Sequence, residues 1–316
     1  MSSIRLFYSQ VALHWGYIIR VPGATAAQPA LTLAPPTTVA GAFAASLLRV
    51  LGFREGIILR AGRAGVEGAF SKVFECILKS TVAASMGLHP IRDEGVGLSV
   101  IMEPSRLIAA PYKTGGDRRA FEESPWSIGF YKEGITKALP VQAVGATYGP
   151  SALVDLVWAV DVESLVKCLP YEGASVENID RVGHYAVYGV TRLGSKEGIC
   201  SAVAACYVEE PVVINVGETF TAHTYVPAKC VAPLHSQLVS RVQMWDLSYL
   251  YEDYYAPSKT TLTLAYPPAY DPSVLPSYRL VDGCKAYHIK VDKLPGKCEK
   301  LKEMKSIEWA VAVGRG

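Results

Sequence analysis

The segment from Val21 to Leu48 contains no charged residue, although it is long enough to cross a membrane. A membrane-spanning helix needs about 20 consecutive apolar residues, and proline interrupts the hydrogen bonds of a helix interior. Four prolines divide this segment, at positions 22, 29, 35 and 36. We therefore expect a proline-rich loop followed by a short helix, in a soluble, cytoplasmic protein without a membrane partner.

The expected helix runs from about Thr38 to Leu51. Threonine is a favoured N-cap, so Thr37 or Thr38 is expected to begin the helix, and Gly52 is expected to follow its end. The helix is rich in alanine, glycine and serine, which are small enough to let a strand or an RNA backbone pack closely. Free N–H groups at the helix N-terminus would also favour a phosphate. Simple capping is the alternative role for both threonines.

A second motif lies far downstream, where residues 191–198 read Thr-Arg-Leu-Gly-Ser-Lys-Glu-Gly and precede an apolar run from Ile199 to Val208. Glycine lets backbone N–H groups approach an anion, and the hydroxyl of Ser195 and the ammonium group of Lys196 add donors. A turn of this kind suits contact with a phosphodiester. An ordinary polar hairpin turn can have the same composition.

These two motifs, in this order, resemble those of the CRISPR-associated Cas family five, a RAMP-superfamily subunit of the Cascade effector. Members of this family hold the repeat-derived five-prime tag of the CRISPR RNA (crRNA), and the apolar character of this chain looks most like the archaeal type I-A branch. The resemblance covers most of residues 1 to about 210. It implies a non-catalytic antiviral-defence subunit without metal or cofactor. The implied partners are the crRNA tag, the family-seven backbone subunit, and the large and small Cascade subunits.

The pattern of apolar residues predicts alternating strands and helices over the first two thirds of the chain. Expected strands are 4–10, 96–102 (ended by Pro104), 141–147, 152–160, 184–190 and 199–209, and expected helices are 38–51, 69–86, 162–169 and 175–181. This order predicts an α+β fold with a ferredoxin-like, RRM-like (RAMP) domain over residues 1–212. Residues 213–316 are expected to form a β-rich C-terminal module.

The RNA-binding residues implied by the resemblance belong to the turn at residues 191–198, called the glycine turn below, and to the start of the first helix. A single-stranded tag would be held by phosphate contacts and by stacking of its bases on aromatic or arginine side chains. The predicted set is Arg192, Gly194, Ser195, Lys196, Thr37 and Thr38, together with Arg20.

A long irregular segment, residues 104–140, takes the place of the family's thumb, the hairpin that wedges between tag and guide beside the backbone subunit. Irregular segments of this length are usually functional or disordered. Residues 115–119 are the expected tip, and a solvent-exposed loop with its own apolar cluster is the alternative. The residues assigned to this thumb are Arg106, Lys113, Arg118, Arg119, Trp126 and Lys132.

Two other functions stay open from the sequence. In the first, the chain cuts CRISPR repeat RNA without metal, as some relatives do, with His14 and Tyr17, or His184 and Lys196, as base and cation. The Tyr-Lys-His constellation of that nuclease branch does not align with this chain. In the second, the chain is a protein-only scaffold, which fits its 50% apolar residues but leaves the glycine turn unexplained.

Charge and cysteine content constrain these alternatives weakly. The net charge is only +2, and residues 1–150 hold 15 Lys and Arg against 10 Asp and Glu. Seven cysteines contain no Cys-x-x-Cys pair, so a zinc ribbon is not expected and scattered buried thiols are. Only two asparagines occur, which suggests a thermophile, and in a hyperthermophile cytosol a disulfide stays possible.

Overall fold

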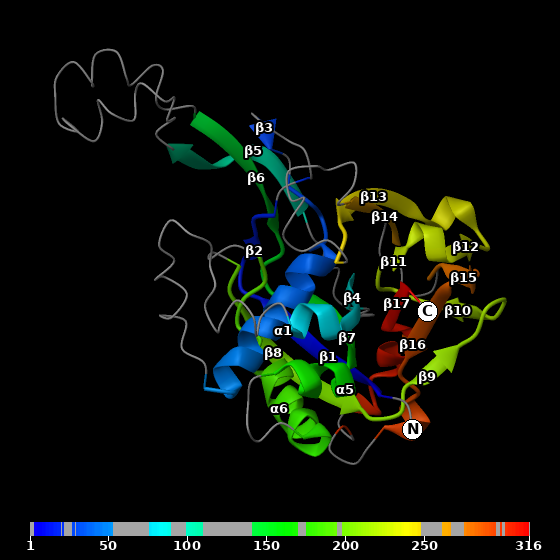
Figure 1. Cartoon of the computed structure of the whole chain (residues 1–316). Coiled ribbons are helices and arrows are strands. Elements are labelled where there is room, and N and C mark those ends of the chain that lie inside the picture. The colour runs from blue at the N-terminus through cyan, green and yellow to red at the C-terminus, as the bar shows by residue number, and fades with distance from the viewer. Residues whose placement is uncertain are drawn as a thin grey trace, which may run out of the picture.

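The central element of the structure is a four-stranded antiparallel sheet (Figure 1). Its strands are β1 (Ile4–Leu13), β4 (Thr81–Leu88), β7 (Leu153–Asp161) and β8 (Cys200–Val208), in the order β4-β7-β1-β8. Every neighbouring pair is antiparallel. The computed structural model describes residues 3–19, 21, 27–28, 30–52, 76–89, 99–109, 141–169, 175–194, 198–247, 261–266, 275–294, 298 and 301–315.

Three helices pack against one face of this sheet: α1 (Pro36–Val50), α5 (Val162–Cys168) and α6 (Val176–Tyr188). Successive residues of a strand point to opposite faces, and Phe7 and Trp158, paired across β1 and β7, point to the helix side. The ring of Phe43 in α1 lies 5.2 Å from that of Phe7 and 5.5 Å from that of Trp158, between centroids. Trp158 donates its indole N–H to the carbonyl of Val39 (2.8 Å), so its polar atom is satisfied within the core.

The C-terminal part of the chain covers the opposite face of the sheet. Leu6, Tyr8 and Val157 point to this side, where they form a second apolar cluster with Tyr287 and Ala312. The covering sheet consists of β9 (Val212–Ile214), β16 (Cys284–His288) and β17 (Val311–Arg315), in the order β17-β16-β9. Because both faces of the central sheet are buried, β7 is buried at every position between its two ends.

Two further three-stranded sheets lie in the described C-terminal part. One contains β10 (Thr219–Thr221), β15 (Ser277–Leu280) and β12 (Val231–Pro233), and the other contains β11 (Val226–Pro227), β14 (Thr261–Tyr266) and β13 (Ser240–Trp245). Short 3₁₀ turns accompany them: η2 (Ala228–Cys230), η3 (Ser236–Leu238), η4 (Val291–Lys293) and η6 (Lys305–Trp309). The described structure is thus of mixed α+β type, with its helices packed on one side of the central sheet.

A long hairpin extends away from the central sheet (Figure 1). It pairs β5 (Ser99–Ala109) with β6 (Val141–Tyr148), and β6 also pairs with β2 (Gly16–Tyr17) and β3 (Ala27–Gln28). The register of the β5–β6 pair shifts between Ile101 and Arg106. Proline has no N–H to donate to a ladder, and such an irregularity accommodates Pro104 inside the strand. The expectation that Pro104 ends the strand is therefore wrong.

The second predicted helix is wrong over its C-terminal part. Residues 76–80 are helical, but β4 begins at Thr81; residues 69–75 lie outside the described part of the chain. Thr81 and Val82 are β-branched, which favours extended backbone. Strand β4 pairs with β7 as far as Leu88, so pairing in the central sheet outweighs the helical spacing of the apolar residues.

The predicted strand at residues 184–190 is also wrong, because residues up to Tyr188 belong to α6. Ser175 caps this helix, since its hydroxyl accepts a hydrogen bond from the N–H of Asn178 (3.2 Å). The buried residues of α6, which include Ile179, Gly183 and Ala186, recur at helical spacing. Of the helices in the described part of the chain, none is long and apolar enough to cross a membrane.

Three disulfides join distant parts of the described chain: Cys76–Cys168, Cys206–Cys298 and Cys230–Cys284. The Cα atoms of the three pairs lie 5.8, 5.4 and 5.6 Å apart, within the usual range for cystine. Cys200 is free and buried. The expectation of scattered buried thiols is therefore wrong for six of the seven cysteines. The pair Cys206–Cys298 links β8 directly to the part of the chain that covers the sheet.

We expect the double variant Cys206→Ala/Cys298→Ala to lose about 2–5 kcal/mol of unfolding free energy, because the crosslink restricts a long loop of the unfolded chain. Chemical denaturation under oxidising conditions measures this loss. Cys200→Ala is the matched control, since it removes a buried thiol without removing a crosslink. Equal midpoints for the double variant and this control would contradict a stabilising role for the disulfide.

Candidate nucleic-acid interface

The glycine turn lies where α6 connects to β8. Arg192 forms an isolated bridge with Ile199, and the N–H of Leu193 donates to the carbonyl of Gly198 (2.7 Å), so residues 192–193 lie beside residues 198–199. Gly194 has a φ of +79°, and a Cβ atom there would lie 2.8 Å from Cγ1 of Ile19. Backbone conformation and packing therefore both require glycine at this position. Leu193 is buried, whereas the neighbouring Arg192 is exposed to solvent.

The start of α1 differs from the sequence prediction. Pro35 is the N-cap and Pro36 the first helical residue, so Thr37 and Thr38 lie inside the first turn, half-buried. Proline suits this position because its fixed φ is helical and its missing N–H would have no partner there. The N–H of Thr38 donates to the carbonyl of Pro35 (2.9 Å), and no side chain caps the helix. The expectation that a threonine is the N-cap is therefore wrong.

Arg49, in the last turn of α1, contacts the glycine turn and was not among the predicted residues. Its guanidinium group donates to Oγ1 of Thr191 (3.1 Å) and to the carbonyl of Gly189 (3.4 Å), and the side chain is exposed. Basic residues are common at helix C-termini, so the sequence alone gave no reason to link Arg49 to the turn. Thr37 lies 12 residues earlier in the same helix, which corresponds to about 18 Å along its axis. Thr37 and Arg49 therefore lie near opposite ends of α1.

Most of the other predicted site residues lie outside the described part of the chain. Arg106 is within β5, where its backbone pairs with Val144. Ala109, the last residue of β5, pairs with Val141, the first residue of β6. The predicted thumb segment therefore connects two strand ends that lie side by side. The residues outside the described part are Arg20, Ser195, Lys196, Lys113, Arg118, Arg119, Trp126 and Lys132.

A buried hydrogen-bond cluster joins the central sheet to the C-terminal part. Asp155 of β7 is fully buried, and its Oδ2 accepts hydrogen bonds of 2.7 Å from Nδ1 of His89 and from Nε2 of His223. Its Oδ1 accepts a third hydrogen bond, of 2.7 Å, from the hydroxyl of Tyr8. Burial alone would raise the pKa of Asp155, but the hydrogen bonds from His223 and His89 lower it well below its usual range. This enclosed carboxylate therefore holds two parts of the fold together.

Replacing Asp155 by Asn should cost about 3–5 kcal/mol of unfolding free energy at neutral pH, because His89, His223 and Tyr8 lose a buried anionic acceptor. A carboxyl whose folded-state pKa is lowered stabilises the protein fully above its unfolded-state pKa of about 3.9, and this contribution fades as the pH falls through the folded-state value. The difference between wild type and Asp155→Asn should therefore be constant above about pH 5 and shrink below about pH 4.

Denaturation midpoints measured across this pH range test the Asp155 prediction. Asp292→Asn, at an exposed position, is the control and should change stability by no more than about 0.5 kcal/mol. A difference between wild type and Asp155→Asn that stays constant through the acid range would show that the ionised form of Asp155 is not the source of the stabilisation.

The described candidate nuclease residues make structural contacts. Tyr17 is fully buried and donates its hydroxyl to the carbonyl of Thr32, and burial raises its pKa, so it is unsuited to act as a base. Exposed His14 shares a hydrogen bond of 2.8 Å with the hydroxyl of Ser201. His184 lies on a helix, in ring contact with neighbouring tyrosines. Among the described residues, no group of three His, Cys, Asp or Glu side chains is placed to hold a metal ion.

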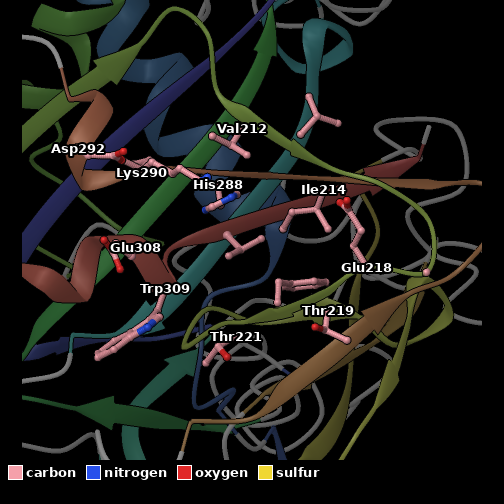
Figure 2. A pocket seen from close by; sticks show the side chains of 15 residues that line it. Val212, Ile214, Glu218, Thr219, Thr221, His288, Lys290, Asp292, Glu308 and Trp309 are labelled. Carbon is pink, nitrogen blue, oxygen red and sulfur yellow. The ribbon is translucent and has the colours of Figure 1, made fainter.

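A groove of about 850 Å³ lies in the C-terminal part, lined by β9, β10, η4 and η6 (Figure 2). Its charged side chains are mainly acidic, with Glu218, Asp292 and Glu308 against Lys290. Burial, and then the charge of Lys290, lower the pKa of His288, which favours its neutral form. The excess of carboxylates disfavours a phosphate, so this groove suits nucleic acid less well than the glycine turn does.

The solved structures with a similar fold include one that matches over the whole chain. It is a CRISPR protein from Archaeoglobus fulgidus, with a TM-score of 0.53 and 13% sequence identity over 99% of both chains. Two structures described as CRISPR RNA-guided surveillance complexes, one of them pre-nicking, have TM-scores of 0.28 and 0.25 at 10% and 7% identity. Each covers 66% of this chain, and 71% and 80% of the other chain. No family model and no curated protein matches the sequence.

Proposed function

We propose that the protein is a non-catalytic, RNA-binding subunit of a CRISPR type I effector, of the archaeal type I-A branch, which holds the five-prime tag of the crRNA. The observation that carries the proposal is the likeness of fold to the Archaeoglobus fulgidus CRISPR protein along the full length of both chains. The glycine turn, with its exposed Arg192, adds a place for a phosphate. The three disulfides suit a hyperthermophilic source.

The topology supports a ferredoxin-like RAMP domain. The strands of the central sheet and the helices that cover it occur along the chain in the order β1, α1, β4, β7, α5, α6 and β8. Within the sheet the strands lie in the order β4-β7-β1-β8. The order along the chain is the β-α-β-β-α-β succession of a ferredoxin-like fold, with α5 and α6 in the place of its second helix. RRM domains bind RNA on the open face of such a sheet. Here the C-terminal part buries that face, so we expect RNA on the helix side and at the turn.

The β5–β6 hairpin supports a thumb at residues 104–140, because this segment begins within β5 and ends directly before β6. Arg106 lies at the register shift of this hairpin, and the glycine turn packs on Ile19, two residues after β2, which pairs with β6. A thumb in this position would let the subunit contact both the crRNA and the next subunit of a filament. The proposed protein partners are the family-seven backbone subunit and the large and small Cascade subunits.

Replacing Arg192 by Ala should weaken binding of a single-stranded RNA of about ten nucleotides by about 1–2 kcal/mol, because one charge-assisted contact to a phosphate is lost. The slope of log affinity against log salt concentration should fall by about one unit. Fluorescence anisotropy at several salt concentrations measures both quantities, and the RNA should stay intact in the presence of a metal chelator.

Arg279→Ala, which removes an exposed arginine from β15, is the matched control and should leave both quantities unchanged. Equal losses for the two variants would mean that the turn is no specific site. Specific cleavage of the RNA that disappeared in His14→Ala would establish the nuclease alternative instead.

A further inference from the structure

We propose that the exposed face of α6 is a base-stacking platform for single-stranded RNA, continuous with the glycine turn; this inference rests on the proposed function. The solvent face of α6 carries Glu177, Arg181, Tyr185 and Tyr188, at the spacing of one helix face. Tyr185 is 59% exposed and Tyr188 is 48% exposed. Large aromatic side chains bury well, and two of them exposed on one helix face indicate a surface that binds something.

The tyrosine pair is held in place by neighbouring rings. The ring of His184 stacks on that of Tyr185, with centroids 6.4 Å apart and planes inclined by 7°. The centroid of the His184 ring also lies 5.3 Å from that of Tyr188 and 5.4 Å from that of Tyr207 in β8. Tyr207 is buried. The aromatic surface is therefore anchored to the central sheet. A fixed stacking surface binds bases at a smaller cost in conformational entropy than a mobile one.

The positive charge around this face favours RNA as its ligand. Arg181 lies on the same helix face one turn before Tyr185. Arg49 contacts the carbonyl of Gly189, directly after Tyr188, and Arg192 follows in the turn. Exposed guanidinium groups thus flank the tyrosines on both sides, and each keeps donors for phosphate.

The acidic groups of α6 do not cancel this charge pattern. Glu177 lies at the far end of the face, in the first turn of the helix. Asp180 is buried in an ion pair with Arg5 (3.1 Å). Alternation of aromatic rings and cations along a surface is what single-stranded nucleic acid binds, because bases stack on the rings while the backbone follows the charges.

The test compares Tyr185→Ala/Tyr188→Ala with Tyr185→Phe/Tyr188→Phe in the full-length protein. The probe is a fluorescent oligoadenylate of about ten nucleotides. We expect the alanine pair to weaken binding at least about tenfold, since each stacked base is lost, and the phenylalanine pair to stay within about twofold of wild type. The salt slope should be unchanged in both, because neither variant removes a phosphate contact. Leu234→Ala, at an apolar position 44% exposed on the C-terminal part, is the control for loss of exposed apolar surface.

The possible results distinguish a failure of this inference from a failure of the proposed function. Wild type that fails to bind the RNA would overturn both. Wild type that binds while the alanine pair binds equally well would overturn the stacking platform and leave the proposed function standing. A loss in the phenylalanine pair equal to that in the alanine pair would replace stacking by a hydroxyl contact. Unchanged RNA affinity together with lost assembly into a larger complex would make the face a protein-docking surface, contrary to the proposal.

Discussion

Burial of both faces of the central sheet is the constraint on which the rest of the structure depends. The helices cover one face, and the C-terminal part covers the other and supplies His223 to the carboxylate of Asp155. A carboxylate in an apolar interior is stable only when its oxygens are hydrogen-bonded, so Asp155 favours the state in which the C-terminal part is docked. The Cys206–Cys298 disulfide holds the same two parts together covalently. Docking of the C-terminal part therefore completes the core of the molecule.

This arrangement decides where a ligand can bind. A sheet covered on both sides offers no open face, so in the proposed function RNA binds at the helices, the turns or the projecting hairpin. The glycine turn meets this requirement because Gly194 packs on Ile19 while Arg192 stays exposed. The same turn contacts the C-terminal end of α1 through Arg49, and α6 leads directly into it. One edge of the helical layer therefore brings Arg49 next to a distant segment that carries Tyr185, Tyr188 and Arg192.

The sequence predicted β1, β7, α5 and β8 because their apolar runs and turn signals are local. It misassigned β4, where pairing with β7 outweighed the helical spacing of the apolar residues, and the second half of α6, where Gly183 and Ala186 continue the buried helical face. It also gave no sign of the Asp155 cluster, since His89 and His223 lie 66 and 68 residues from Asp155. Of the predicted site, Gly194 is required by its backbone, and Thr37 and Thr38 lie near the other end of α1 from the turn. The contact of Arg49 with the turn depends on helix packing that no local pattern encodes.

Our central proposal is that RNA binds on the helical side and not on the covered face or in the acidic groove. Ultraviolet crosslinking of bound 4-thiouridine RNA, followed by mass spectrometry of the linked peptides, tests this most directly. We expect crosslinks to Tyr185, Tyr188 and the turn at residues 191–194. Crosslinks concentrated on the groove, for example at Trp309 or His288, with none on α6 or the turn, would contradict it.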